Sequence, residues 1–120
     1  MSENRVDLKQ LIMLIKDTKE IEANLILDEG CTLMTDDPKP LVKVLNYIIN
    51  YLGQLSDQAL EISLDLRTSD HLLSLMVYTD KPDLPAFSSE IDDVLKTYKA
   101  SLEKIHESGK YVQIKLSFAH

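Results

Sequence analysis

Apolar residues recur at helical spacing in three stretches of the chain. Between Leu8 and Ile15 they stand at i, i+3, i+4 and i+7, directly after Asp7, which favours the N-cap position. A second stretch follows residues 36–40, where an acidic residue before proline is typical of a helix start. Its apolar face carries Leu41, Val44, Leu45, Ile48, Leu52 and Leu55.

The third stretch begins at Ser88 or Ser89 and ends at Ser108-Gly109, where glycine favours a helix C-terminus. Its apolar face carries Ile91, Val94, Leu95, Tyr98, Leu102 and Ile105. The sequence therefore predicts three amphipathic helices, each of which must bury one face against another layer.

Alternating apolar and polar residues predict strands between these helices. Residues 21–27 are typical of a half-buried strand, and residues 32–34 of a short one. Residues 60–77 alternate around a turn at 68–71, which predicts a β-hairpin, and residues 112–118 predict a last strand. The expected fold class is α+β: a two-layer sandwich with three helices packed on one face of a mixed, mostly antiparallel sheet.

Length and composition favour a single cytoplasmic domain covering residues 1–120. No continuous apolar run reaches the roughly 18 residues of a membrane span, and the polar first ten residues do not resemble a signal peptide. Cys31 is the single cysteine, so no intramolecular disulfide is expected, which fits a reducing compartment.

The net charge of −7 argues against nucleic acid or an anionic membrane as a direct ligand. Thirteen basic residues are scattered among twenty acidic ones, whereas phosphate binding needs clustered lysine and arginine. A surface of this kind steers the protein toward basic or neutral partners.

The sequence contains no set of residues typical of a metal site or of a catalytic nucleophile. The three histidines, His71, His106 and His120, are too far apart in sequence to give metal-ligand spacing. Cys31 has no neighbouring base, and the acidic pairs at 36–37 and 92–93 are typical of helix N-termini. We therefore expect no catalytic residue, no metal and no cofactor.

The order of elements and several short, mostly apolar segments resemble the ATPase domain of sensor histidine kinases, the GHKL-type family. These segments are Val6-Asp7-Leu8, Leu11-Ile12, the strand at 23–27, Asp37, Leu41, Val44-Leu45, Ile48-Ile49, the hairpin at 60–78 and the strand at 111–118. Members of the family use an acidic residue, a leucine and a Val-Leu pair at these spacings to start the helix that carries their N-box. The resemblance covers nearly the whole chain and implies the same fold.

The N-box of that family places an asparagine on this helix as a Mg²⁺ ligand between the nucleotide phosphates. Asn46 and Asn50 stand four apart, but a gapless alignment of residues 37–56 puts Tyr47 and Tyr51 at the N-box positions. In the register shifted by one residue Asn50 survives, and Tyr51 replaces a small residue beside the nucleotide. Both registers predict impaired ATP binding.

The glycine motifs that hold the adenine and wrap the phosphates in this family have no counterpart here. Asp80 stands at the position of the adenine-binding aspartate, but Lys81-Pro82-Asp83-Leu84 follows it, and no glycine occurs between Gly53 and Gly109. The predicted remnant of the nucleotide cleft therefore comprises Tyr47, Asn50, Tyr51 and Asp80. The two tyrosines either pack against the N-terminal helix or line this remnant as part of a protein-binding surface.

These features predict a degenerate, pseudo-ATPase domain from a bacterium that is not an enzyme. It would be a non-catalytic signalling, regulatory or adaptor module that acts through a protein partner or as a homodimer. Two alternatives remain open. One is a small anti-sigma-type ATP-binding protein kinase with an atypical nucleotide site, and the other is an unrelated α+β domain.

Overall fold

A five-stranded sheet forms one layer of the computed structural model, which describes residues 4–119. The strand order is β2-β4-β5-β7-β6, and β2 runs parallel to β4 while the other three pairings are antiparallel. The strands are β2 (Ala23–Leu27), β4 (Leu60–Leu66), β5 (Asp70–Tyr78), β6 (Ala100–Glu107) and β7 (Tyr111–Ala119).

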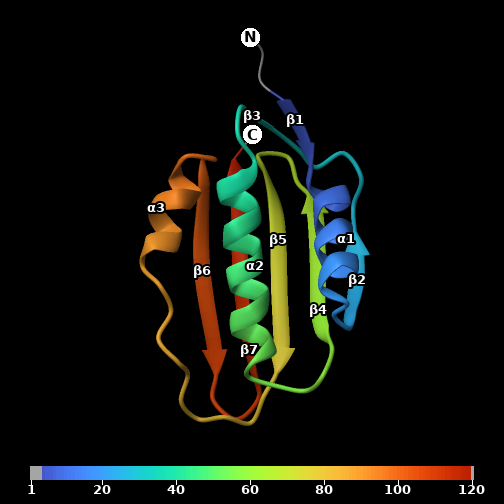
Figure 1. The fold of residues 1–120 in the computed structure, drawn as a ribbon. Helices are drawn as coiled ribbons and strands as arrows, with labels where there is room; N and C mark the ends of the chain where they lie inside the picture. Colours follow the sequence, from blue (N-terminus) through green and yellow to red (C-terminus); the bar gives the residue numbers. More distant parts are fainter. Residues whose placement is uncertain (1–3, 120) are drawn as a thin grey trace.

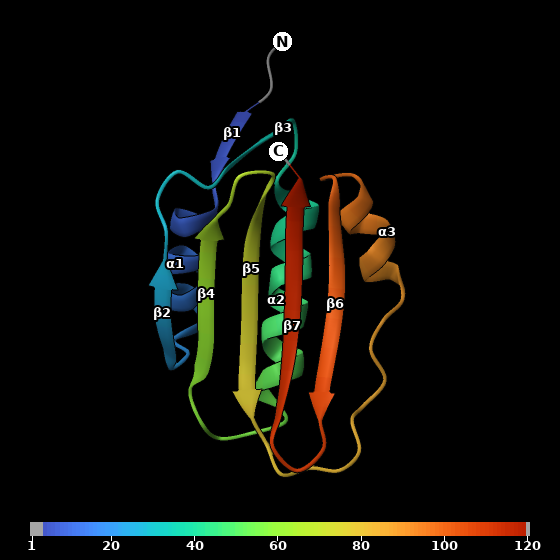
Figure 2. The same ribbon diagram turned by 180° about the vertical axis from the view of Figure 1, so that it is seen from behind.

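Three helices of the described chain form the second layer: α1 (Leu8–Lys19), α2 (Lys39–Gly53) and α3 (Glu90–Lys96). They lie on one face of the sheet, with α2 over its centre and α1 and α3 toward opposite edges (Figure 1). Seen from behind, the other face carries no helix of the described residues (Figure 2). The predicted α+β sandwich is confirmed. No described helix is long and apolar enough to cross a bilayer.

A second, two-stranded sheet joins the start of the chain to the segment before α2. Strand β1 (Asn4–Asp7) pairs antiparallel with β3 (Thr32–Thr35), and Val6 lies opposite Leu33. The sequence predicts the β3 segment but not β1, because Val6 is the one apolar residue of β1 and gives no alternation.

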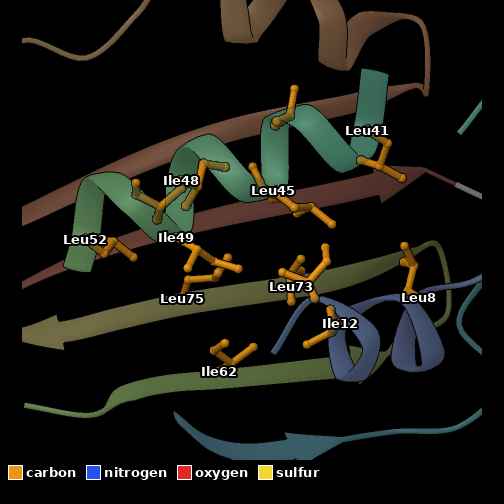
Figure 3. Packing of buried hydrophobic residues seen from close by; sticks show 14 of the residues in the cluster. Leu8, Ile12, Leu41, Leu45, Ile48, Ile49, Leu52, Ile62, Leu73 and Leu75 are labelled. Atoms are coloured by element: carbon orange, nitrogen blue, oxygen red, sulfur yellow. The ribbon is translucent and has the colours of Figure 1, made fainter. Parts of the chain in front are cut away.

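The core lies between α2 and the middle of the large sheet. Every residue of the predicted α2 face is buried. In Figure 3 the labelled Leu45 and Leu52 lie on the side of α2 toward Leu73 and Leu75 of β5. Burying one leucine or isoleucine side chain contributes about 1.5–3 kcal/mol. The two inward-facing leucines of β5 and the α2 face therefore account for the position of α2 over the sheet centre.

The first helix is capped as the sequence predicts. Oδ1 of Asp7 accepts hydrogen bonds from the backbone N–H of Lys9 at 3.0 Å and of Gln10 at 3.3 Å. We expect Asp7→Ala to lower the free energy of unfolding by about 1 kcal/mol, measured by urea denaturation. Asp17→Ala is the control, because the exposed Asp17 side chain near the other end of α1 caps no N-terminal amide, and it is expected to change stability by less than about 0.5 kcal/mol. Equal losses in both variants would contradict the capping role.

The predicted helix from 88 to 108 is wrong in its second half. Helix α3 ends at Lys96, Lys99 turns the chain with φ of 55°, and residues 100–107 form β6, paired antiparallel with β7. Gly109 supplies the turn between these strands with φ of 78°, so it ends a strand and not a helix. The inward positions of β6 hide the strand alternation because two of them are polar; they are Ala100, Leu102, Lys104 and His106.

Candidate functional site

Three aromatic rings meet between α2 and the loop 79–89 that connects β5 to α3. Tyr47 and Tyr51 lie one turn apart on α2, with ring centroids separated by 6.4 Å. Phe87 in the loop packs edge-on against both, at 5.3 Å from Tyr47 and 5.0 Å from Tyr51. Edge-to-face pairs at these distances are attractive beyond the area that they bury. We call Tyr47, Tyr51 and Phe87 the aromatic cluster.

The two tyrosine hydroxyls hold the backbone of the loop. Tyr51 Oη donates to the carbonyl oxygen of Pro85 at 2.8 Å, and the backbone N–H of Ser88 donates to Tyr47 Oη at 2.9 Å. At the start of the loop, Thr79 Oγ1 donates to the carbonyl oxygen of Leu55 at 2.8 Å. The loop is therefore fastened along its length by side chains to α2 and to the residue beyond the end of α2.

A lysine from the sheet completes the surroundings of the aromatic cluster. Lys104 Nζ of β6 lies 5.4 Å from the centroid of Phe87 and 5.8 Å from that of Tyr51. A cation over ring faces at this distance is favourable. Burial, and after it the neighbouring Tyr47, raises the pKa of the Tyr51 hydroxyl, so this group stays protonated and donates to Pro85 at neutral pH.

The other two predicted cleft residues lie elsewhere. Asn50 is on a different side of α2, where its Oδ1 accepts from Lys19 Nζ of α1 at 3.0 Å. Asp80 is exposed and lines a surface hollow of ≈ 560 Å³ between the end of α2 and the β6–β7 turn, together with Lys81 and Lys110. The structure thus brings Tyr47 and Tyr51 together and separates Asn50 and Asp80 from the aromatic cluster.

One of the two predicted roles of the tyrosines is packing against the N-terminal helix. Their ring and hydroxyl contacts are instead with the loop 79–89, and Tyr51 also lies near Lys104 of β6. Phe87 and Lys104 were missed in the sequence. Phe87 lies in a proline-containing loop without periodicity, although a lone aromatic residue in a polar segment was an available signal. Lys104 was missed because the apolar spacing of its segment predicts a helix.

No metal centre emerges within residues 4–119, since no three histidine, cysteine, aspartate or glutamate side chains gather closely enough to hold an ion. Cys31 is a buried free thiol. Burial, followed by the charges of Asp28, Asp7 and Asp65, raises the pKa of Cys31, so its thiol stays protonated at neutral pH.

No family model and no curated protein sequence matches the chain. Solved histidine kinases do match in structure. AdeS of Acinetobacter baumannii has a TM-score of 0.76 at 13% identity, over 99% of this chain and 68% of that one. The nucleotide-free catalytic domain of ThkA has a TM-score of 0.73 at 13% identity, over 99% of this chain and 97% of that one. Full-length ShkA in complex with AMPPNP has a TM-score of 0.75 at 10% identity, over 99% of this chain and 32% of that one.

The prediction that the chain is not an enzyme is contradicted by these matches, because the structures that share its fold include histidine kinase catalytic domains, and histidine kinases are enzymes. At such low identity the likeness concerns the fold and no individual activity. The chain has the GHKL-type ATPase fold of the histidine kinases.

Proposed function

We propose that this domain is a signalling or regulatory module that acts through contacts with a protein partner, and that its own aromatic cluster takes the space of a nucleotide. The observation that carries the proposal is the closure of the loop 79–89 onto α2. The hydroxyls of Tyr51 and Tyr47 are hydrogen-bonded to the backbone of Pro85 and Ser88. The Phe87 ring packs edge-on against both tyrosine rings.

The residues present do not fit a nucleotide with its Mg²⁺. Phenol rings occupy the side of α2 that faces the loop, and Asn50, the remaining amide of the remnant cleft, is engaged by Lys19 on another side of the helix. The loop contains no glycine, so its backbone lacks the residues that best allow close approach to phosphates. Its backbone groups at Pro85 and Ser88 are already hydrogen-bonded to the cluster.

The proposed place for a protein partner is the helix-free side of the sheet. The face of the sheet opposite the helices carries none of the described helices (Figure 2). Ile26 on the edge strand β2 is 75% exposed, and Tyr78 at the end of β5 is 46% exposed. Tyrosine and apolar side chains of this kind are favoured in protein interfaces.

Thermal unfolding with millimolar Mg-ATP tests the proposal. We expect no change in melting temperature, because a ligand stabilises a native state only by binding it. Saturation at a hundredfold excess over the dissociation constant would add about 2.7 kcal/mol, a shift of several degrees in a domain of this size. ShkA, which was solved with AMPPNP, is the positive control in the same assay. A clear shift in this chain would overturn the proposal.

The hollow beside Asp80 favours a second candidate function, an anti-sigma-type protein kinase with an atypical nucleotide site. Lys81 and Lys110 line this hollow with Asp80, and their ammonium groups can attract phosphates. In that case Mg-ATP would raise the melting temperature of the natural chain, and Lys81→Ala with Lys110→Ala would abolish the shift. Labelled phosphate would then also pass from ATP to a protein substrate.

A further inference from the structure

The outward positions of the large sheet follow from its register. In β4 as far as Leu64, and in β5 and β7, every second residue is buried under the helices, so the residues between them point to the opposite, helix-free face. The backbone pairing carries this alternation across to β6, where Glu103 lies opposite Lys115 and Ile105 opposite Gln113. We call this set of outward side chains the open face.

The centre of the open face is uncharged along most of β5 and β7. Leu72, Met76 and Tyr111 are half-buried there, and Tyr78 is 46% exposed. The polar side chains among them satisfy each other, since Gln113 Nε2 donates to Ser74 Oγ at 2.7 Å. We call this central part of the open face the floor. A partner can cover the floor without leaving the Ser74 and Gln113 side chains without a hydrogen-bond partner.

Acidic residues line both sides of this floor. Glu61 and Asp65 stand on β4, and Glu103 and Glu107 stand on β6. Asp70 at the start of β5 also points to this face, and it forms an ion pair with Arg67, just beyond β4. Apart from that pair, Lys115 of β7 is the one basic side chain that the described strands direct to the open face, so the four margin carboxylates against one ammonium give a net charge of −3. The open face thus has an apolar and hydroxyl-rich middle between two acidic margins.

The strand order sets the distance between the acidic margins. β4 and β6 are separated by three strand spacings, because β5 and β7 lie between them. At about 4.8 Å for each spacing, the margins are roughly 14 Å apart. An α-helix with its side chains is about 10–12 Å across, so one helix fits lengthwise along the floor.

We propose that the open face binds an amphipathic helix of a partner protein, with apolar residues on the floor and lysine or arginine residues against the two acidic margins. An added strand is not suited to this place, since the backbone groups of β5 and β7 are paired within the sheet. Anionic lipid is repelled by the same carboxylates. The inference rests on the proposed action through protein contacts and names the surface and the partner chemistry.

The test is an NMR titration of the full-length, ¹⁵N-labelled chain with synthetic helical peptides of about 18 residues, five turns. One peptide carries a leucine stripe and lysine on its other positions. Two matched peptides replace every lysine by glutamate, or every leucine by serine. We expect the first peptide alone to shift amide resonances of β5 and β7, with an affinity that falls as salt is added.

Two charge-reversal variants show whether the peptide binds at the open face or is attracted by the net charge of the protein in general. Glu61→Lys with Glu103→Lys is expected to weaken binding of the leucine–lysine peptide at least tenfold. Asp92→Lys with Asp93→Lys changes the net charge equally on the exposed side of α3, in the helix layer, and is expected to leave affinity unchanged. The spectrum of each variant without peptide shows whether it is folded.

Three results would overturn the inference: equal weakening in both variants, equal binding of the serine peptide, or shifts confined to the helix layer. Absence of binding by any peptide would overturn it as well. Shifts in the helix layer would leave the proposed protein-binding function standing, whereas stabilisation by Mg-ATP would remove that function independently of the peptide result.

Discussion

Tyr51→Ala is expected to lower the free energy of unfolding by about 3–5 kcal/mol, the usual cost of truncating a buried aromatic side chain. Tyr51 is 3% exposed, lies edge-on to Phe87 and donates to the carbonyl oxygen of Pro85. Its removal therefore leaves a cavity and also releases the loop 79–89 from α2. Urea denaturation followed by circular dichroism measures the loss.

Two tyrosine variants separate the contributions to this loss. Tyr51→Phe keeps the ring contacts and removes only the hydrogen bond to Pro85, so a loss of about 0.5–1.5 kcal/mol is expected. Tyr78→Ala removes a tyrosine that is 46% exposed and is expected to cost less than about 0.5 kcal/mol. If Tyr51→Ala cost no more than Tyr51→Phe, the aromatic cluster would not be what holds the loop closed.

The elements that could be predicted from the sequence are those in which one periodicity extends over the whole element. The α2 face repeats over four turns, and all of its apolar residues are buried in the structure. The hairpin of β4 and β5 alternates on both strands around a polar turn. In each case the local pattern and the tertiary environment favour the same conformation, which makes the pattern informative.

Strand β6 shows why the rest of the fold could not be predicted. Its inward positions include Lys104, which interrupts the apolar alternation, and its apolar residues combine with those of α3 into a helical spacing. Lys104 is tolerated on the inward side because its ammonium group lies over the rings of Phe87 and Tyr51. Those rings come from distant parts of the sequence, so no local window contains the reason for the strand.

The candidate site divides in the same way. Helical geometry places Tyr47 and Tyr51 on one side of α2 and turns Asn50 about 100° away from Tyr51, and this could be predicted once the helix was recognised. The contact of Phe87 with both tyrosines depends on the path of the loop 79–89, which has no periodic pattern. Loop conformation here is set by contacts with α2, and these appear only in the folded chain.

Tyr98→Phe is expected to lower the free energy of unfolding by about 1–3 kcal/mol, because it leaves a buried helix amide without an acceptor. Pro38 at the start of α2 has no side chain that can cap the helix. Oδ1 of Asp37 accepts from the backbone N–H of Lys39, and the Tyr98 hydroxyl, two residues beyond α3, serves the next turn. It accepts from the backbone N–H of Leu41 at 3.1 Å and donates to the carbonyl oxygen of Asp37 at 2.7 Å. Urea denaturation gives the loss, and hydrogen exchange shows whether the Leu41 amide loses protection.

Tyr78→Phe is the matched control, since the exposed Tyr78 side chain is expected to tolerate loss of its hydroxyl within about 0.5 kcal/mol.

The pKa of Tyr98 is raised in the folded chain, mainly by burial. The hydrogen bond from Leu41 opposes this rise, and the charge of Asp37 adds to it. A raised pKa means that the neutral hydroxyl stabilises the fold below about pH 10 and that this contribution is lost as pH rises through the folded pKa. The stability difference between the natural chain and Tyr98→Phe should therefore narrow above about pH 10. Unchanged protection of Leu41 in Tyr98→Phe would instead show that another group caps α2.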